Sequence, residues 1–149
     1  MTTTLIENSN IRVLLDTNVV IDALTMRDLD YQPSRQIWRH VLSGNINGFL
    51  SSKQITDIYY IFKKYYKDEK IVREYLRNLV DSFEILPFFK GDILACLKTE
   101  MEDFEDAIIC ESAKVNMIPI VVTNNIKHFT NSKIMVLTPQ QLLEMFSLE

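Results

Sequence analysis

Glycine and proline are scarce in this sequence, which has three Gly and four Pro among 149 residues. Their scarcity argues against long irregular loops and against a glycine-rich loop that wraps a phosphate group. No apolar run approaches the roughly 18 residues that a membrane-spanning helix needs. No basic stretch followed by an apolar one opens the chain, as it would in a secretory signal. We therefore expect a cytoplasmic protein with no membrane contact.

Cysteine is also rare, and basic residues are fewer than acidic ones. Cys96 and Cys110 are isolated within apolar helical patterns, so we interpret them as buried thiols in a reducing compartment. The net charge is −4, and such a field repels nucleic acid and anionic membranes. This argues against a protein that binds nucleic acid through charge alone. It leaves a metalloenzyme open, because a bound divalent cation reverses the local sign.

What the sequence does contain is short apolar runs that alternate with helical patterns. Strands are predicted at 11–15, 47–50, 83–86, 118–122 and 135–137. Helices are predicted after residue 16 and at 34–43, 53–65, 68–81, 92–98, 107–114 and 140–146. This alternation is typical of an α/β protein with three layers, in which helices cover both faces of a mostly parallel sheet of four to five strands. We expect one domain over residues 1–149, with residues 1–10 frayed.

The chain is organised around the stretch Ile11 to Asp22, IRVLLDTNVVID. Its apolar strand ends at Asp16, and helical spacing resumes directly afterwards. The ordinary explanation of Asp16 is a helix N-cap. However, open α/β sheets bind their ligands outside the carboxyl ends of the strands, which is where this aspartate stands.

Other polar residues occupy comparable positions at strand ends or helix starts. They are Asp57, Asp103, Asp106 and Asn125. Because parallel strands end at one edge of a sheet, we expect these side chains to converge with Asp16. Crowded carboxylates repel one another unless a cation lies between them, and hard oxygen ligands suit Mg²⁺ or Mn²⁺.

The acidic stretch from Glu100 to Asp106 also has a purely structural explanation. Negative charge at a helix N-terminus complements the helix dipole, which would account for Asp103 and its neighbouring glutamates. Asp106 precedes the apolar Ala107-Ile108-Ile109 and is expected to lie nearer the core. A metal site therefore remains a hypothesis for these acids.

Four blocks of the sequence stand out together: LLDTNVVID, SSKQITDIYYI, DFEDAIICESA and IVVTNNIKHF. They resemble successive parts of the PIN domain, and in particular of the bacterial subgroup related to VapC-type toxins. They occur in the family's order, and the match extends from about residue 11 to residue 142. The resemblance implies a ribonuclease that uses Mg²⁺ or Mn²⁺ held by acids from each block.

Carried over by position, the resemblance assigns catalytic roles to Asp16, Asp57 and Asp106. It assigns metal binding to Asp16, Asp103, Asp106 and Asn125, with Thr17, Asn18 and Thr123 in support. Two positions depart from the family pattern: Asp57 stands where many members have Glu, and Asn125 where a fourth Asp is common. His128 is interpreted as a surface residue.

The implied reaction is hydrolysis of a phosphodiester by a metal-activated water. The implied partners are RNA, an antitoxin protein and a second copy of the chain. Tyr59, Tyr60, Tyr65 and Tyr66 are candidates for a dimer or antitoxin face, or for the core. No patch of mixed basic and aromatic residues marks a base-reading surface, so no substrate-binding residue is assigned.

Two other functions fit parts of the pattern. One is a non-catalytic PIN-like scaffold with a decayed metal site, in which the acids are caps. The other is a phosphatase or phosphotransfer receiver, which also clusters aspartates at strand ends. A receiver needs a lysine after a late strand, whereas Leu137 is followed by Thr138-Pro139.

Overall fold

A single five-stranded sheet forms the centre of the protein, in the order β3-β2-β1-β4-β5. The structure is a computed structural model, and it describes residues 11–26 and 30–149. All four strand pairings are parallel, which confirms the α/β class predicted from the sequence. The strands are β1 (Arg12–Leu15), β2 (Asn47–Ser51), β3 (Glu84–Leu86), β4 (Ile120–Val122) and β5 (Met135–Leu137).

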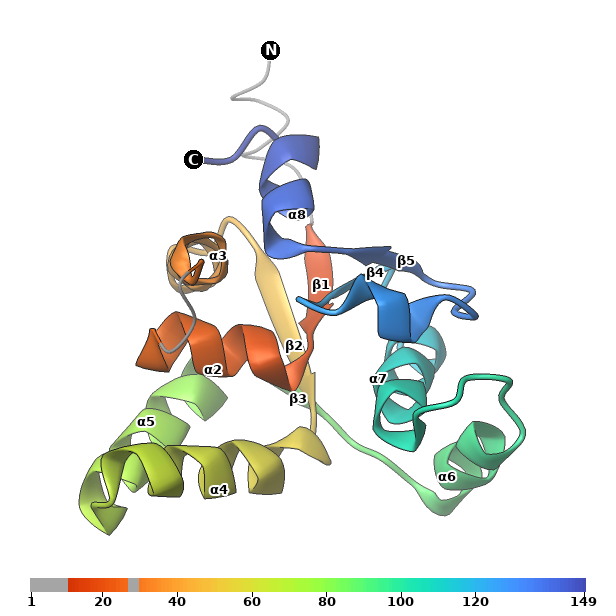
Figure 1. Ribbon diagram of the computed structural model, residues 1–149, viewed down its shortest axis with the longest axis horizontal. Helices are drawn as coiled ribbons and strands as arrows, with labels where there is room; N and C mark the ends of the chain where they lie inside the picture. Colours follow the sequence, from red (N-terminus) through yellow and green to blue (C-terminus); the bar gives the residue numbers. More distant parts are fainter. Residues whose placement is uncertain (1–10, 27–29) are drawn as a thin grey trace.

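Helices cover both faces of this sheet, as Figure 1 shows. One face carries α2 (Thr17–Thr25), α3 (Gln32–Leu42), α4 (Gln54–Tyr66), α5 (Glu69–Ser82) and α8 (Pro139–Met145). The other carries α6 (Lys90–Leu97), α7 (Phe104–Val115) and the 3₁₀ turn η1 (Ile126–Phe129). None of these helices is long and apolar enough to cross a membrane.

Alternation along β1 separates two hydrophobic cores. Val13 and Leu15 pack into the core under α2–α5 and α8, whereas Leu14 packs with Phe49 and Val121 into the core under α7. Successive side chains of a strand point to opposite faces, so a short strand can serve both cores. β1 lies between β2 and β4 in the sheet, which makes its carboxyl end the centre of the edge where ligands are expected.

The elements agree with the predicted ones except at their ends and in one turn. The helix predicted at 34–43 begins earlier at Gln32, with Pro33 in its first turn. The helix predicted at 92–98 begins at Lys90, since the Asp92 carboxylate accepts a hydrogen bond from the Phe89 N–H and so completes the helix start. The turn η1 was not predicted, because four residues are too few to show a helical period. The residues predicted to be frayed, 1–10, lie outside the described part of the chain.

Candidate metal-binding and active site

Asp16 joins the end of β1 to the start of α2, and both of its carboxylate oxygens accept hydrogen bonds. Oδ1 accepts from the Thr17 N–H at 2.7 Å, as an N-cap does, and Oδ2 accepts from the Thr123 hydroxyl at 2.8 Å. The Asp16 N–H donates to the carbonyl of Val122 in β4 at 2.8 Å. Asp16 is therefore an N-cap and is also fixed in orientation by the neighbouring strand. The two explanations offered by the sequence are compatible.

Asp103 and Asp106 come together at the start of α7. Asp103 is the N-cap, and its Oδ1 accepts from the Asp106 N–H at 3.0 Å. Asp106 is only 9% exposed, as its apolar neighbours suggested. Its Oδ2 is buried and accepts no hydrogen bond from the described residues. A buried carboxylate oxygen without a donor is costly and needs an explanation, such as a bound ion or water.

Electrostatics show that these three acids are neighbours. Burial raises the pKa of Asp106 to about 6, and the charges of Asp103 and Asp16 add to the shift. Burial also raises the pKa of Asp16, where hydrogen bonds from Thr123 and Thr17 act in the opposite direction and Asp103 again raises it. A nearby cation would favour the ionised forms of Asp16 and Asp106, because an opposite charge lowers the pKa of a carboxyl group.

His128 is an exposed residue of η1 that sequence reasoning left on the surface. Its Nδ1 lies 3.6 Å from Oδ2 of Asp106, the oxygen that lacks a hydrogen bond. The only hint in the sequence is its place three residues after Asn125, in the same block. A helical turn brings residues three apart to one side, and that side here faces α7.

Thr123 and Asn125 follow β4 and meet Asp16 from the other side. Thr123 is fully buried, and its hydroxyl oxygen both donates to Asp16 and accepts the Asn125 N–H at 3.0 Å. The Asn125 side chain is exposed and caps no N–H of η1. Its amide oxygen is thus not used to cap η1, and it carries no charge.

A second polar pair supports this loop and was missed from the sequence. Asn124 donates its side-chain N–H to Oδ2 of Asp22 at 2.7 Å, and its backbone N–H lies 3.4 Å from Oδ1 of Asn18. Asp22 is 4% exposed, so the exposed Asn124 reaches a buried carboxylate of α2. The pairing joins residues 102 positions apart, which no local pattern could have indicated.

Asp57 is the one predicted acid that the structure does not bring into this group. It is exposed in the first turn of α4 and is absent from the groups that shift the pKa of Asp16 or Asp106. The buried polar residue at this helix start is instead Gln54, one turn earlier. Its amide donates to the Leu15 carbonyl at 2.8 Å and accepts from the Ser51 N–H at 2.7 Å, which joins the ends of β1 and β2.

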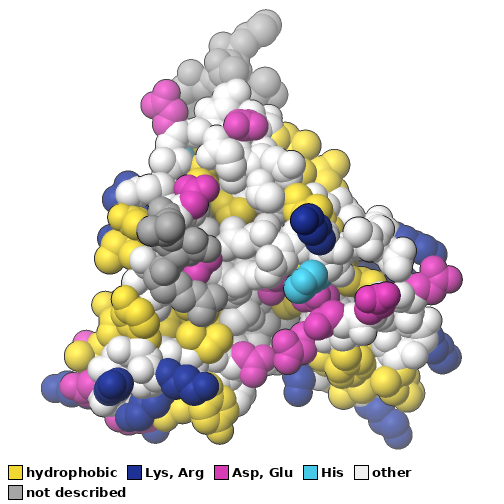
Figure 2. All heavy atoms as spheres, viewed as in Figure 1, with side chains coloured by type: hydrophobic (Ala, Val, Ile, Leu, Met, Phe, Trp, Pro, Cys, Tyr) yellow, Lys and Arg dark blue, Asp and Glu magenta, His cyan; other side chains and the backbone are white. Residues whose placement is uncertain are grey.

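The oxygen atoms of these side chains are suitable ligands for a hard divalent cation, although the side chains do not converge on one coordination site. Within residues 11–26 and 30–149, no three Asp, Glu, His or Cys side chains are gathered tightly enough to hold an ion as they stand. Carboxylate oxygens from Asp16, Asp103 and Asp106, together with the amide of Asn125, are nevertheless the ligand types that Mg²⁺ and Mn²⁺ take, usually with several waters. The orphaned oxygen of Asp106 is the best fit to such an ion. In Figure 2, acidic side chains form a band across this face, beside a histidine and a basic residue.

A family model described as PIN domain matches residues 12–127, which includes every site residue predicted from the sequence. The chain belongs to the PIN domain family. Ribonuclease VapC1 of Aquifex aeolicus (strain VF5) is 28% identical over 138 residues, which cover 89% of this chain and 94% of that protein.

Solved structures show the same PIN fold. VapBC2 of Rickettsia felis, bound to a DNA fragment from its promoter, matches with a TM-score of 0.62 and 20% identity, covering 84% of this chain and 96% of that one. FitAcB of Neisseria gonorrhoeae matches with a TM-score of 0.65 and 19% identity, covering 86% and 98%. A toxin-antitoxin complex from Klebsiella pneumoniae gives a TM-score of 0.63 and 24% identity, covering 85% and 97%.

Proposed function

We propose that this PIN domain is a metal-dependent endoribonuclease. The observation that carries the proposal is the buried Oδ2 of Asp106, which accepts no hydrogen bond from the described residues and lies beside the Asp16 and Asp103 carboxylates. The likeness to a protein named ribonuclease VapC1 supports RNA as the substrate. The oxygen donors of Asp16, Asp103, Asp106 and Asn125 would hold Mg²⁺ or Mn²⁺.

Each residue has a role that follows from its position. A divalent ion in this site would lower the pKa of a water and offset charge on the phosphate. Asp16, held by Thr123 and its own helix, supplies a fixed carboxylate at the centre of the edge. Asp106 supplies the buried one. Asp57 lies across the edge on α4 and is the candidate to orient the attacking water or the RNA backbone from the opposite side.

The partners follow from the relatives rather than from the site. Because structural neighbours are VapBC, FitAcB and toxin-antitoxin complexes, an antitoxin chain is the partner we propose, with the nuclease acting as the toxin. A second copy of the chain is proposed as a further partner. Tyr60 and Tyr65 are the most exposed of the four candidate tyrosines, at 61% and 53%, and so are the ones available to either surface.

The test is cleavage of labelled single-stranded RNA with Mn²⁺, with and without EDTA. Asp16→Asn should abolish cleavage and leave the fold intact, because Asn caps a helix as well as Asp does. Asp81→Asn, an equal change at an exposed site on α5, should cleave like the wild type. Failure of the wild type to cleave, together with no heat of Mn²⁺ binding in a calorimetric titration, would leave the non-catalytic scaffold as the function.

A further inference from the structure

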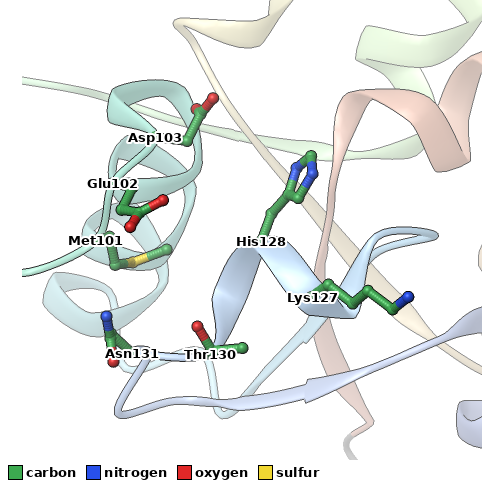
Figure 3. Close-up of a pocket in the computed structure, with 7 residues that line it drawn as sticks. All are labelled: Met101, Glu102, Asp103, Lys127, His128, Thr130 and Asn131. Atoms are coloured by element: carbon green, nitrogen blue, oxygen red, sulfur yellow. The ribbon is translucent and has the colours of Figure 1, made fainter.

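A hollow of about 340 Å³ opens beside the acid cluster, between two segments that are distant in the sequence. One wall consists of Met101, Glu102 and Asp103, which lead into α7. The other comes from residues 127, 128, 130 and 131, in η1 and directly after it. In Figure 3 the Glu102 side chain points across the space toward His128, and the Lys127 side chain extends away from the acidic wall. Its volume is in the range of small-molecule binding sites.

The hollow shares two residues with the candidate active site. Asp103 lines it and also caps α7 through the Asp106 N–H at 3.0 Å. His128 lines it and places Nδ1 3.6 Å from Oδ2 of Asp106. A group that occupies this hollow therefore lies next to the phosphodiester that the acids would process.

The polar atoms of the hollow are arranged in a complementary way. Glu102 and Thr130 make no side-chain hydrogen bond or ion pair with another residue of the described chain. The Asn131 amide makes one long contact, from its N–H to the Glu100 carbonyl at 3.4 Å, which leaves its second N–H available. One wall thus offers a carboxylate acceptor, and the opposite side offers amide and hydroxyl donors.

The remaining lining residues suit the flat faces of a base. Met101 is half-buried and packs against the core under α7, so its side chain forms an apolar part of the lining. Thioethers contact aromatic rings favourably. The exposed imidazole of His128 stands opposite, and unpaired bases stack on such rings when proteins bind RNA.

We propose that this hollow binds an unpaired guanine adjacent to the phosphodiester that is cleaved. Guanine is the common base with two adjacent donors, N1–H and the 2-amino group, on its Watson–Crick edge, and these match the Glu102 carboxylate. Its O6 accepts from Asn131 or Thr130. Adenine and cytosine would each turn a ring-nitrogen lone pair toward the carboxylate, and uracil would turn a carbonyl oxygen toward it. This inference rests on the proposed nuclease function, since the adjacency to a cleaved phosphate depends on it.

The experiment measures binding separately from cleavage. Full-length Asp16→Asn protein in EDTA is titrated into fluorescein-labelled uridine oligonucleotides with one central guanosine, inosine or adenosine, and anisotropy is read. Guanosine should bind about tenfold more tightly than inosine, which lacks only the 2-amino group, and than adenosine. Adding Glu102→Gln should remove this preference, while Glu105→Gln, the loss of an equal charge outside the hollow, should retain it.

Two outcomes would overturn the proposal: equal binding of the three oligonucleotides, or a preference that survives Glu102→Gln. Asn131→Ala provides an independent variant on the opposite wall, and it should weaken guanosine binding without affecting adenosine. Guanine-selective binding with no cleavage by the wild type would remove the nuclease and keep the guanine site. Metal-dependent cleavage with no preference for guanine in binding would do the reverse.

Discussion

The starts of α2 and α4 follow neighbouring parallel strands, yet they hold their acids differently. At α2 the acid is the cap itself, and Asp16 accepts hydrogen bonds from Thr17 and Thr123. At α4 the buried polar residue is Gln54, which ties the two strand ends together, and Asp57 stands exposed one turn later. Position after a strand thus places both acids at one edge, but only hydrogen bonds from a second strand fix an acid's orientation in advance.

Removal of the fixed acid should have the largest effect. Loss of outer-shell partners of a metal site typically lowers activity 10- to 100-fold, so Asp16→Asn, which alters a proposed direct ligand, should lower kcat by at least about 100-fold. The free energy of unfolding without metal should change little, since the cap is retained. RNA cleavage rates and urea denaturation check this together. A variant that lost activity only by unfolding would argue against a catalytic Asp16.

The buried residue at the start of α4 should matter for stability rather than for activity alone. Gln54→Leu keeps the volume but leaves the buried Ser51 N–H without its acceptor, at a cost of about 2 kcal/mol in the free energy of unfolding. Gln140→Leu is the matched control, because that side chain is exposed and donates its hydrogen bond to the exposed Glu144, and its effect should be within about 0.5 kcal/mol. Equal effects of the two changes in urea denaturation would show that Gln54 does not join the strands.

The difference between the two helix starts also shows which features can be predicted from the sequence: the position of an acid can be, but its distant hydrogen-bond partners cannot. Apolar periodicity predicted the strands and helices because each follows from residues close in the chain. Position at a strand end singled out Asp16, and position at a helix start singled out Asp103 and Asp106. Gln54 and Asn124 were missed because their partners, Leu15 and Asp22, lie 39 and 102 positions away. The fixed orientation of Asp16 likewise depends on Thr123, 107 positions away, so its location was predictable but its hydrogen-bond geometry was not.

Asp106 should make the metal-free protein sensitive to pH. Its folded pKa of about 6 lies above the ordinary value of 3.8, so the folded state binds more protons between those values. The free energy of unfolding therefore falls as the pH rises from about 4 to 6. Asp106→Asn should remove this part of the slope and, in EDTA at pH 7.5, stabilise the protein by about 1.5 kcal/mol, after allowance for solvent screening and for the favourable charge at the start of α7.

Metal provides the control for that prediction. Mn²⁺ should raise the melting temperature of the wild type, because an ion that binds only the folded state stabilises it. It should raise that of Asp106→Asn much less. If the variant were as stable as the wild type at both pH 4 and pH 7.5, burial of the ionised Asp106 carboxylate would not destabilise the folded protein.

Asp57 should give the smallest effect and the sharpest comparison with Asp16. Asp57→Asn should lower kcat by about tenfold, in the lower part of the range for groups outside the immediate ligand set, and should change stability by less than about 0.5 kcal/mol because the side chain is exposed. Asp57→Glu should retain activity or increase it, because one added methylene extends the carboxylate from the α4 surface toward the acids across the edge. Cleavage rates for the two variants decide the role. If both variants cleaved like the wild type, the active site would consist of the residues after β1 and β4 and at the start of α7. The start of α4 would then contribute only the Gln54 hydrogen bonds that join β1 and β2.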